Sequence, residues 1–176
     1  MKVTFLAHSI TTDNEQGLAS GWNDVELSEE GRKRIADWAK NFDITNIDAV
    51  FTSDLQRAYH TAQIAFPGIE PRKLFLDWRL RECDYGKLTR QPKESVVDPA
   101  RMSHITTPFP GGESYQQALD RMRSFIEDLK NKPYKHVLVI GSRATHYGFD
   151  VHVGGKTIEE CLSHKFTWQP GWEYEV

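Results

Sequence analysis

The sequence predicts an α/β fold, a three-layer sandwich in which a mostly parallel central sheet carries helices on both faces. Short apolar runs bounded by polar turn residues, typical of buried strands, occur at 3–7, 47–52 and 136–141. Stretches with apolar residues at helical spacing lie between these runs. Because strands that alternate with helices form sheets covered on both faces, this alternation favours the three-layer architecture.

The bulk composition is that of one globular domain over residues 1–176. The chain is 39% hydrophobic and 27% charged, and its 176 residues are enough to bury a substantial core. The net charge of −3 gives no reason to expect binding to nucleic acid or to a membrane. No apolar run approaches the ~20 residues of a membrane helix. Two cysteines, Cys83 and Cys161, form no CxxC pair and no disulfide framework, so we expect a cytoplasmic protein.

The first predicted strand ends abruptly at His8. A polar loop follows, with Ser9, Thr11 and Asn14 among its side chains. Ligands in open α/β sheets bind beyond the carboxyl ends of the strands, so His8 lies where such a fold places its chemistry. The alternative is a histidine that only ends the strand, with both ring nitrogens satisfied by hydrogen bonds.

The second predicted strand, 47–52, leads into Ser53-Asp-Leu-Gln56, a predicted capping box in which Ser53 bonds forward and Gln56 reaches back. The helix that follows carries Arg57 in its first turn. Helix N-termini bind anions through free N–H groups, and an arginine there adds a bidentate donor. Arg57 is therefore a candidate anion ligand, and a solvated surface charge is the alternative.

Caps and turns predict the remaining elements. Ser28 can cap a helix, and Ser114-Tyr-Gln-Gln117 and Thr157-Ile-Glu-Glu160 are predicted capping boxes. The strand that ends at Gly141 runs into Ser142-Arg143-Ala-Thr145, a turn of small residues before another helix. The tail 166–176 alternates around a Pro-Gly turn and is predicted to be strand.

A dense polar corner follows the short predicted strand Leu74-Phe-Leu-Asp77. This corner contains Glu82 and ends at Gly86. Residues 87–110 carry several prolines and show little periodicity. Because a loop this long inside a compact domain is usually functional, we predict a lid or a binding segment here.

A histidine nucleophile, cationic phosphate clamps and a carboxylic acid are what phosphoryl transfer requires, and the strand ends and the polar corner provide them. At these positions the sequence resembles the histidine phosphatase superfamily, in its phosphoglycerate-mutase-like branch. The resemblance covers nearly the whole chain and follows its order. The matching blocks are Ala7-His8-Ser9-Ile-Thr11 with Asn14, Gly21 to Gly31, Thr52 to Ala62, Leu80 to Gly86, and Pro110 to Ser114.

The resemblance implies a two-step phosphoryl transfer. His8 attacks phosphorus to form a phosphohistidine, Glu82 protonates the leaving oxygen, and water then frees phosphate with Glu82 acting as the base. For the attack one ring nitrogen of His8 must be unprotonated, and we expect a backbone carbonyl to hold the other. Asp84 is a weaker candidate for the acid. The predicted substrate-binding residues are Arg57, Ser142, Arg143, Thr11, Asn14 and Ser9.

The implied ligand is a small phosphorylated metabolite or inorganic phosphate, and the resemblance implies no cofactor. No metal site is expected, because His146 and His152 are too loosely spaced to bind zinc without further ligands. Hydrolysis is favoured over mutase activity, since the loop 87–110 is short and weakly basic for holding a bisphosphorylated intermediate.

Two positions depart from the family pattern. Ala7 stands where the family has its first arginine, and Ser142 stands where it has its second active-site histidine. Losing one preorganised donor typically lowers the rate by ~10²–10³. We hypothesise that Arg143 replaces some of the missing charge. The alternative is that Arg143 points to solvent and Ser142 only caps a helix. His146 is a further candidate donor, although a turn of helix separates it from Ser142.

These departures leave two functions open. The first is a phosphatase that acts through His8. The second is a catalytically inactive family member that binds a phosphorylated ligand or a protein partner.

Overall fold

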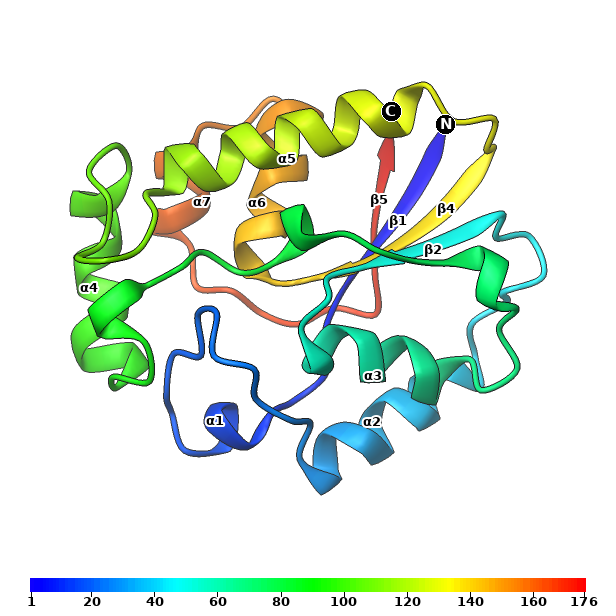
Figure 1. Ribbon diagram of the computed structural model, residues 1–176, viewed down its shortest axis with the longest axis horizontal. Helices are drawn as coiled ribbons and strands as arrows, with labels where there is room; N and C mark the ends of the chain where they lie inside the picture. Colours follow the sequence, from blue (N-terminus) through cyan, green and yellow to red (C-terminus); the bar gives the residue numbers. More distant parts are fainter.

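The computed structural model describes residues 1–176 and is built on a five-stranded sheet with the order β3-β2-β4-β1-β5 (Figure 1). β4 pairs in parallel with both β1 and β2, and β2 pairs in parallel with β3. Only β5 runs antiparallel, along the outer edge of β1. The mostly parallel sheet predicted from the sequence is confirmed. The strands are β1 (Lys2–Ala7), β2 (Ala49–Thr52), β3 (Leu74–Leu76), β4 (His136–Gly141) and β5 (Trp172–Glu175).

Helices cover both faces of the sheet, as the three-layer prediction requires. Successive strand residues point to opposite faces, so each strand contributes to two separate cores. On one face Leu6, Val50 and Leu138 pack with Ile35 and Ala62 from two helices. These helices are α2 (Glu29–Ala39) and α3 (Gln56–Ala65), which lie below the sheet in Figure 1.

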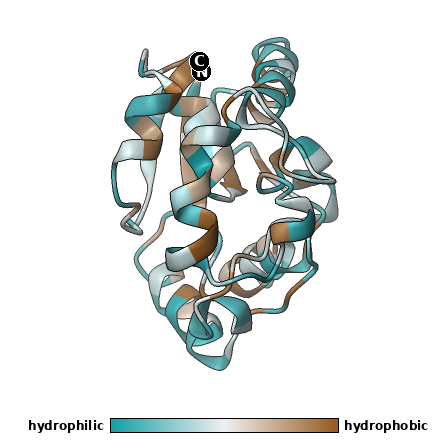
Figure 2. Cartoon of the chain, turned by 90° about the vertical axis from the view of Figure 1, so that its left-hand side faces the viewer, coloured by the Kyte–Doolittle hydropathy of each residue, from teal (hydrophilic) through white to brown (hydrophobic).

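The other face packs against α5 (Tyr115–Lys130) and α6 (Arg143–His152). Phe5 and Val139 of the sheet meet Met122 and Phe125 of α5 and Phe149 of α6. Figure 2 shows that the helices change between hydrophilic and hydrophobic colouring along their length, as expected where only one side of a helix is buried. Three short helices complete the fold: α1 (Thr12–Glu15), α4 (Asp98–Ala100) and α7 (Ile158–Ser163).

Most of the predicted caps are confirmed, but the cap of α3 is different. Ser28, Ser114 and Thr157 accept hydrogen bonds at the N-termini of α2, α5 and α7. The Ser53 hydroxyl, by contrast, has no partner. The Gln56 N–H donates to the Asp24 carboxylate at 2.7 Å, and the Gln56 amide donates to the Asp24 backbone carbonyl at 2.7 Å. A loop residue distant in sequence therefore caps α3, which fastens that loop beside the end of β2.

The segment 87–110 is more regular than its prolines suggest. It folds into consecutive short helical turns at Gly86–Leu88, Lys93–Val97 and Arg101–His104, together with α4. Such turns satisfy backbone groups locally that an irregular loop would leave unpaired. Val97 is fully buried within a satellite core.

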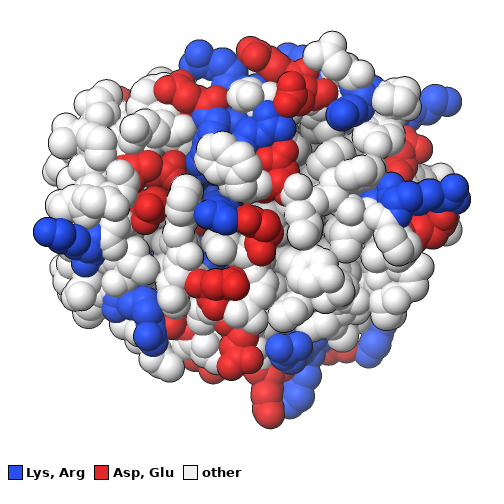
Figure 3. Space-filling model, in the orientation of Figure 1, with Lys and Arg blue, Asp and Glu red and all other residues white.

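Only part of the tail is strand. The predicted strand pattern of 166–176 is realised in β5, and the residues before Gly171 form no ladder. No helix of the structure combines the length and the apolar content needed to cross a bilayer. On the face shown in Figure 3, acidic and basic side chains are interspersed.

Candidate active site

A cavity of about 310 Å³ opens at the carboxyl ends of the parallel strands. His8 follows β1, Arg143 follows β4, and Arg57 lies in the first turn of α3 after β2. Glu82 reaches the same cavity from the polar corner after β3. Six of the predicted site residues are therefore brought together here: His8, Ser9, Asn14, Arg57, Glu82 and Arg143.

His8 is held as a neutral imidazole with one nitrogen free. Its Nδ1 lies 2.7 Å from the Ser9 carbonyl oxygen, and since a carbonyl can only accept, Nδ1 carries the proton. Burial, together with the positive charge of Arg57, lowers the pKa of His8 to about 3. The Nε2 lone pair is therefore available at neutral pH. The alternative of a histidine with both nitrogens satisfied is excluded.

Ser9 fixes the loop behind the histidine. Its hydroxyl donates to the Gly31 carbonyl at 2.7 Å, and its N–H donates to the Thr61 hydroxyl at 3.1 Å. The close approach of this loop to α2 requires glycine at position 31, because a Cβ there would lie 2.0 Å from the Ile10 carbonyl oxygen. The loop after β1 is thus tied to both α2 and α3.

Arg57 is buried, which excludes the solvated alternative. Its side chain and backbone are only 1% exposed. The guanidinium donates to the carbonyls of Asn23 at 2.8 Å and Gly21 at 2.6 Å, and no carboxylate lies within ion-pair distance. Because backbone carbonyls orient the group without neutralising it, its charge remains available to an anion.

The Glu82 carboxylate lies against the start of α6. One carboxylate oxygen accepts hydrogen bonds from the Cys83 N–H at 2.8 Å and from the Ala144 N–H at 3.1 Å. Ala144 belongs to the first turn of α6, so Glu82 is held at the N-terminus of that helix. Asp84, the weaker candidate for the acid, does not line the cavity; its carboxylate accepts from the Gly86 N–H at 2.9 Å.

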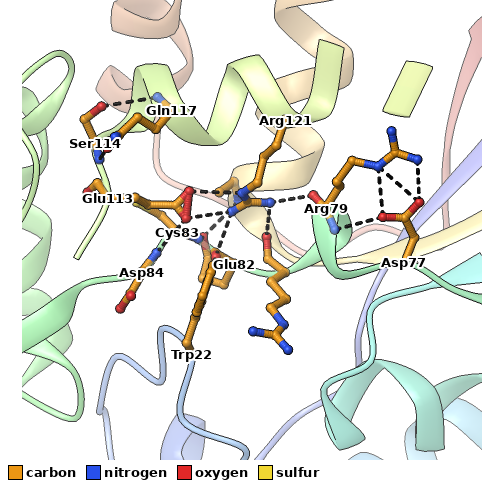
Figure 4. A network of polar contacts seen from close by, with 12 residues as sticks. Trp22, Asp77, Arg79, Glu82, Cys83, Asp84, Glu113, Ser114, Gln117 and Arg121 are labelled. Carbon is orange, nitrogen blue, oxygen red and sulfur yellow. Dashed lines mark hydrogen bonds and ion pairs between the residues drawn. The ribbon is translucent and has the colours of Figure 1, made fainter. Parts of the chain in front are cut away.

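Arg121 of α5 anchors the segment that carries Glu82 (Figure 4). Its guanidinium donates to the Glu82 carbonyl at 2.9 Å and to the Arg81 carbonyl at 2.8 Å, and it pairs with the Glu113 carboxylate at 3.0 Å. The Trp22 indole donates to the same Glu82 carbonyl at 2.7 Å. Arg121 is not among the residues predicted from the sequence, although a charged residue among the apolar positions of a helix is a signal that it is paired.

Arg143 points into the protein. Its side chain is 10% exposed and lines the cavity, which contradicts the solvent-facing alternative. The guanidinium pairs with Asp98 of α4 at 3.2 Å. Asp98 also lies 3.2 Å from Lys93 and 3.3 Å from Arg101, so one carboxylate faces three cations. The helical segment after Pro92 therefore delivers the group that positions Arg143.

Two predicted substrate-binding residues, Thr11 and Ser142, do not line the cavity. The Thr11 hydroxyl accepts from the Asn14 N–H at 3.0 Å and is used in capping α1. Ser142 is the N-cap residue of α6, and its hydroxyl is buried with no partner. His146 is also turned away from the cavity, with its ring 4.3 Å from that of Trp172. These placements follow from helix caps and core packing that spacing alone does not distinguish.

The arrangement can perform phosphoryl chemistry. A neutral imidazole, an unpaired buried guanidinium and a carboxyl group share one cavity, which are the components of nucleophilic attack, charge stabilisation and proton transfer. No three His, Cys, Asp or Glu side chains are grouped so that they could hold a metal ion.

Similarity to known proteins agrees with this chemistry. A family model described as histidine phosphatase superfamily (branch 1) matches residues 3–160. A putative phosphoserine phosphatase 2 from Hydrogenobacter thermophilus is 28% identical over 153 residues, covering 82% of this chain and 75% of the relative. A phosphoglycerate mutase from Candida albicans is 36% identical over 104 residues, which are 55% of this chain and 41% of the mutase. The chain thus spans less than half the length of this mutase relative.

Solved structures share the fold. Bacillus stearothermophilus YhfR superposes with a TM-score of 0.83 at 20% identity, covering 99% of this chain and 91% of that protein. A putative alpha-ribazole-5'-P phosphatase from Escherichia coli gives 0.79 at 21% identity, covering 96% of this chain and 86% of that one. At these identities the likeness establishes the architecture alone. The family match over nearly the whole chain confirms the resemblance found in the sequence, and the chain belongs to the histidine phosphatase superfamily, branch 1.

Proposed function

We propose that the protein is a phosphomonoesterase that removes phosphate from a small phosphorylated metabolite through a phosphohistidine on His8. The observation that carries this proposal is the unprotonated Nε2 of His8 in a cavity shared with Arg57 and Glu82. Relatives that are phosphatases and mutases of the same superfamily support it.

The reaction proceeds in two displacements. In the first, the His8 Nε2 lone pair forms the bond to phosphorus while the ester P–O bond breaks, and the Glu82 carboxyl gives its proton to the leaving oxygen. In the second, the Glu82 carboxylate takes a proton from water as that water attacks phosphorus. The P–N bond breaks, phosphate leaves, and neutral His8 is restored. Arg57 stabilises the charge on the phosphoryl oxygens in both displacements.

The two departures from the family pattern reduce the number of groups on the phosphoryl oxygens. Ala7 supplies no cation, and the Ser142 hydroxyl does not reach the cavity. Arg143 supplies a positive charge from the end of β4, where Asp98 holds it in place. We infer that the rate is lower than that of a site with all its donors, by up to ~10²–10³ for each group lost.

Hydrolysis is favoured over mutase action. The segment 87–110 supplies Lys93 to the cavity, and that lysine is paired with Asp98. A bisphosphorylated intermediate would have to be retained between the two half-reactions, and this segment offers few free cations for that purpose.

The decisive experiment is detection of the covalent intermediate during turnover of an aryl phosphate. Rapid acid-free quenching followed by ³¹P NMR should show an acid-labile phosphoramidate in the wild type and none in His8→Ala. Hydrolysis that continues unchanged in His8→Ala would overturn the proposal.

Neither Ala7 nor Ser142 offers a side chain to bind phosphate. This observation favours one other function, a binding module for phosphorylated ligands. Two further variants separate the possibilities. If the wild type is inactive and Ser142→His hydrolyses the aryl phosphate, the rest of the active site is intact and the defect lies at position 142. If wild type, Ser142→His and Ala7→Arg are all inactive yet bind inorganic phosphate by calorimetry, the binding function is correct.

A further inference from the structure

One cation that lines the cavity, Arg34, takes no part in the proposed hydrolysis. Arg34, in the second turn of α2, lines the cavity together with His8 and Arg57. Its guanidinium makes no hydrogen bond and no ion pair within the chain, and it is half-buried. The guanidinium carbon lies 3.9 Å from the centroid of the Trp168 ring. Arg34 is thus stacked on an aromatic face with its N–H donors unused.

The other cations that line the cavity already have hydrogen-bond or ion-pair partners within the protein. Lys93 and Arg143 share the Asp98 carboxylate at 3.2 Å each. Arg57 donates to two backbone carbonyls. Arg34 is therefore the lining cation with its full charge and hydrogen-bonding capacity available to a ligand.

The platform beneath Arg34 is fixed at two points. The Trp168 indole donates to the Ala7 carbonyl at 3.2 Å, directly before His8. The Trp38 indole donates to the Pro170 carbonyl at 2.7 Å, which fastens the segment to α2. Stacking on a fixed ring orients the guanidinium plane and reduces the side-chain entropy lost when a ligand binds.

Arg34 enters the cavity from a different element than the groups that handle the transferred phosphoryl group. His8 follows the end of β1, and Arg57 and Arg143 stand in the first turns of α3 and α6, directly after β2 and β4, whereas Arg34 stands in the second turn of α2. An anion that meets Arg34 while the transferred phosphoryl group lies at His8 and Arg57 belongs to the part of the substrate that leaves, and planar carboxylate or phosphate oxygens match the guanidinium fork.

We propose that Arg34, stacked on Trp168, binds a second anionic group, a carboxylate or a phosphate, on the leaving alcohol of the substrate. This inference rests on the proposed phosphatase function, and it names the substrate class: phosphomonoesters that carry a further negative charge.

The test compares aryl phosphates that differ in one substituent. The probes are 3-carboxyphenyl phosphate, 1,3-phenylene bisphosphate and the neutral isostere 3-carbamoylphenyl phosphate. Arg34→Gln should lower kcat/KM for one or both anionic probes by ~10-fold or more and change it less than ~2-fold for the carbamoyl probe. Which anionic probe is affected identifies carboxylate or phosphate as the group bound.

Two further variants complete the design. Arg32→Gln is the matched control, because Arg32 is exposed on the same helix and does not line the cavity; it should leave all three rates unchanged. Trp168→Leu removes the platform and should lower the same anionic preference. Equal losses on all three probes in Arg34→Gln would assign Arg34 to the transferred phosphate or to folding and overturn the inference, as would no loss at all.

Binding measurements keep this inference separate from the proposed function. Calorimetry with 3-carboxybenzylphosphonate, 3-phosphonomethylbenzylphosphonate and 3-carbamoylbenzylphosphonate requires no turnover. A preference for an anionic phosphonate that disappears in Arg34→Gln supports the role of Arg34 even if hydrolysis is never observed. Hydrolysis without any anionic preference overturns the role of Arg34 alone.

Discussion

Two histidines, the half-buried His8 after β1 and the buried His146 of α6, both have lowered pKa values but lie in different surroundings. Burial lowers the pKa of His8 to about 3 and that of His146 to about 4. His8 has one nitrogen bonded to a carbonyl and the other free in a cavity lined by cations. His146 has neither nitrogen hydrogen-bonded and is packed among aromatic rings, including those of Phe5 and Trp172.

The comparison shows that a lowered pKa does not by itself identify a functional group. Both imidazoles are neutral at pH 7, but only His8 presents a lone pair to a space that a substrate can enter. The polar neighbours of His146 are structural. Asp150 accepts from the Tyr174 hydroxyl at 2.8 Å and from Lys156 at 2.9 Å, with His146 Nδ1 3.9 Å away.

The largest expected difference between the two histidines is in turnover. His8→Asn should lower kcat for an aryl phosphate by at least ~10³-fold, because no other group can form the covalent intermediate. His146→Phe should leave kcat within ~3-fold of the wild type, since its ring lies outside the cavity. Steady-state assays check both, and circular dichroism confirms folding. Equal losses in the two variants would contradict the different roles of the two histidines.

The polar contacts of Arg121, which hold the segment that carries Glu82, should contribute more to the free energy of unfolding than the hydrogen bond of Tyr174 to Asp150 near His146. Arg121→Ala leaves the Glu113 carboxylate buried without its partner and releases the Glu82 carbonyl, so the free energy of unfolding should fall by ~3–5 kcal/mol. Tyr174→Phe removes one hydrogen bond to Asp150 and should cost ~1–2 kcal/mol. Urea denaturation measures both. Arg123→Ala, an exposed residue on the same helix as Arg121, is the control.

Stability should depend on acid pH through both histidines. Because each pKa is lowered in the folded protein, the unfolded chain binds more protons between its pKa of 6.5 and the folded values of about 3 and about 4. The free energy of unfolding therefore falls as pH drops below 6.5, by on the order of 1 kcal/mol per pH unit for each histidine. His146→Phe should reduce this slope between pH 6.5 and about 4. An unchanged slope in urea titrations would contradict the placement of His146.

The smallest expected effect concerns Ser142. Its hydroxyl has no partner and lies outside the cavity lining, so Ser142→Ala should change the free energy of unfolding by less than ~0.5 kcal/mol. KM for an aryl phosphate should also stay the same. A clear rise in KM would return Ser142 to the substrate-binding set.

Much of the fold follows from local patterns. The apolar runs that became β1, β2 and β4 are recognisable because parallel strands are buried on both faces. Three of the four predicted capping residues are found in place, since a cap depends on residues three apart. The cap of α3 was predicted wrongly because Asp24, a residue from another part of the chain, competes for the same N–H groups.

The amino-acid sequence is enough to assign the family, the strand ends at which His8 and Arg57 stand, and the block that carries Glu82. These features are local in the chain, and motif spacing records them. Which side chains enter the cavity depends on the tertiary structure. The Thr11 hydroxyl caps α1, the Arg143 guanidinium pairs with Asp98, and Arg34 is stacked on Trp168. Each of these outcomes is a competition among partners far apart in sequence, and packing settles it only when the chain has folded.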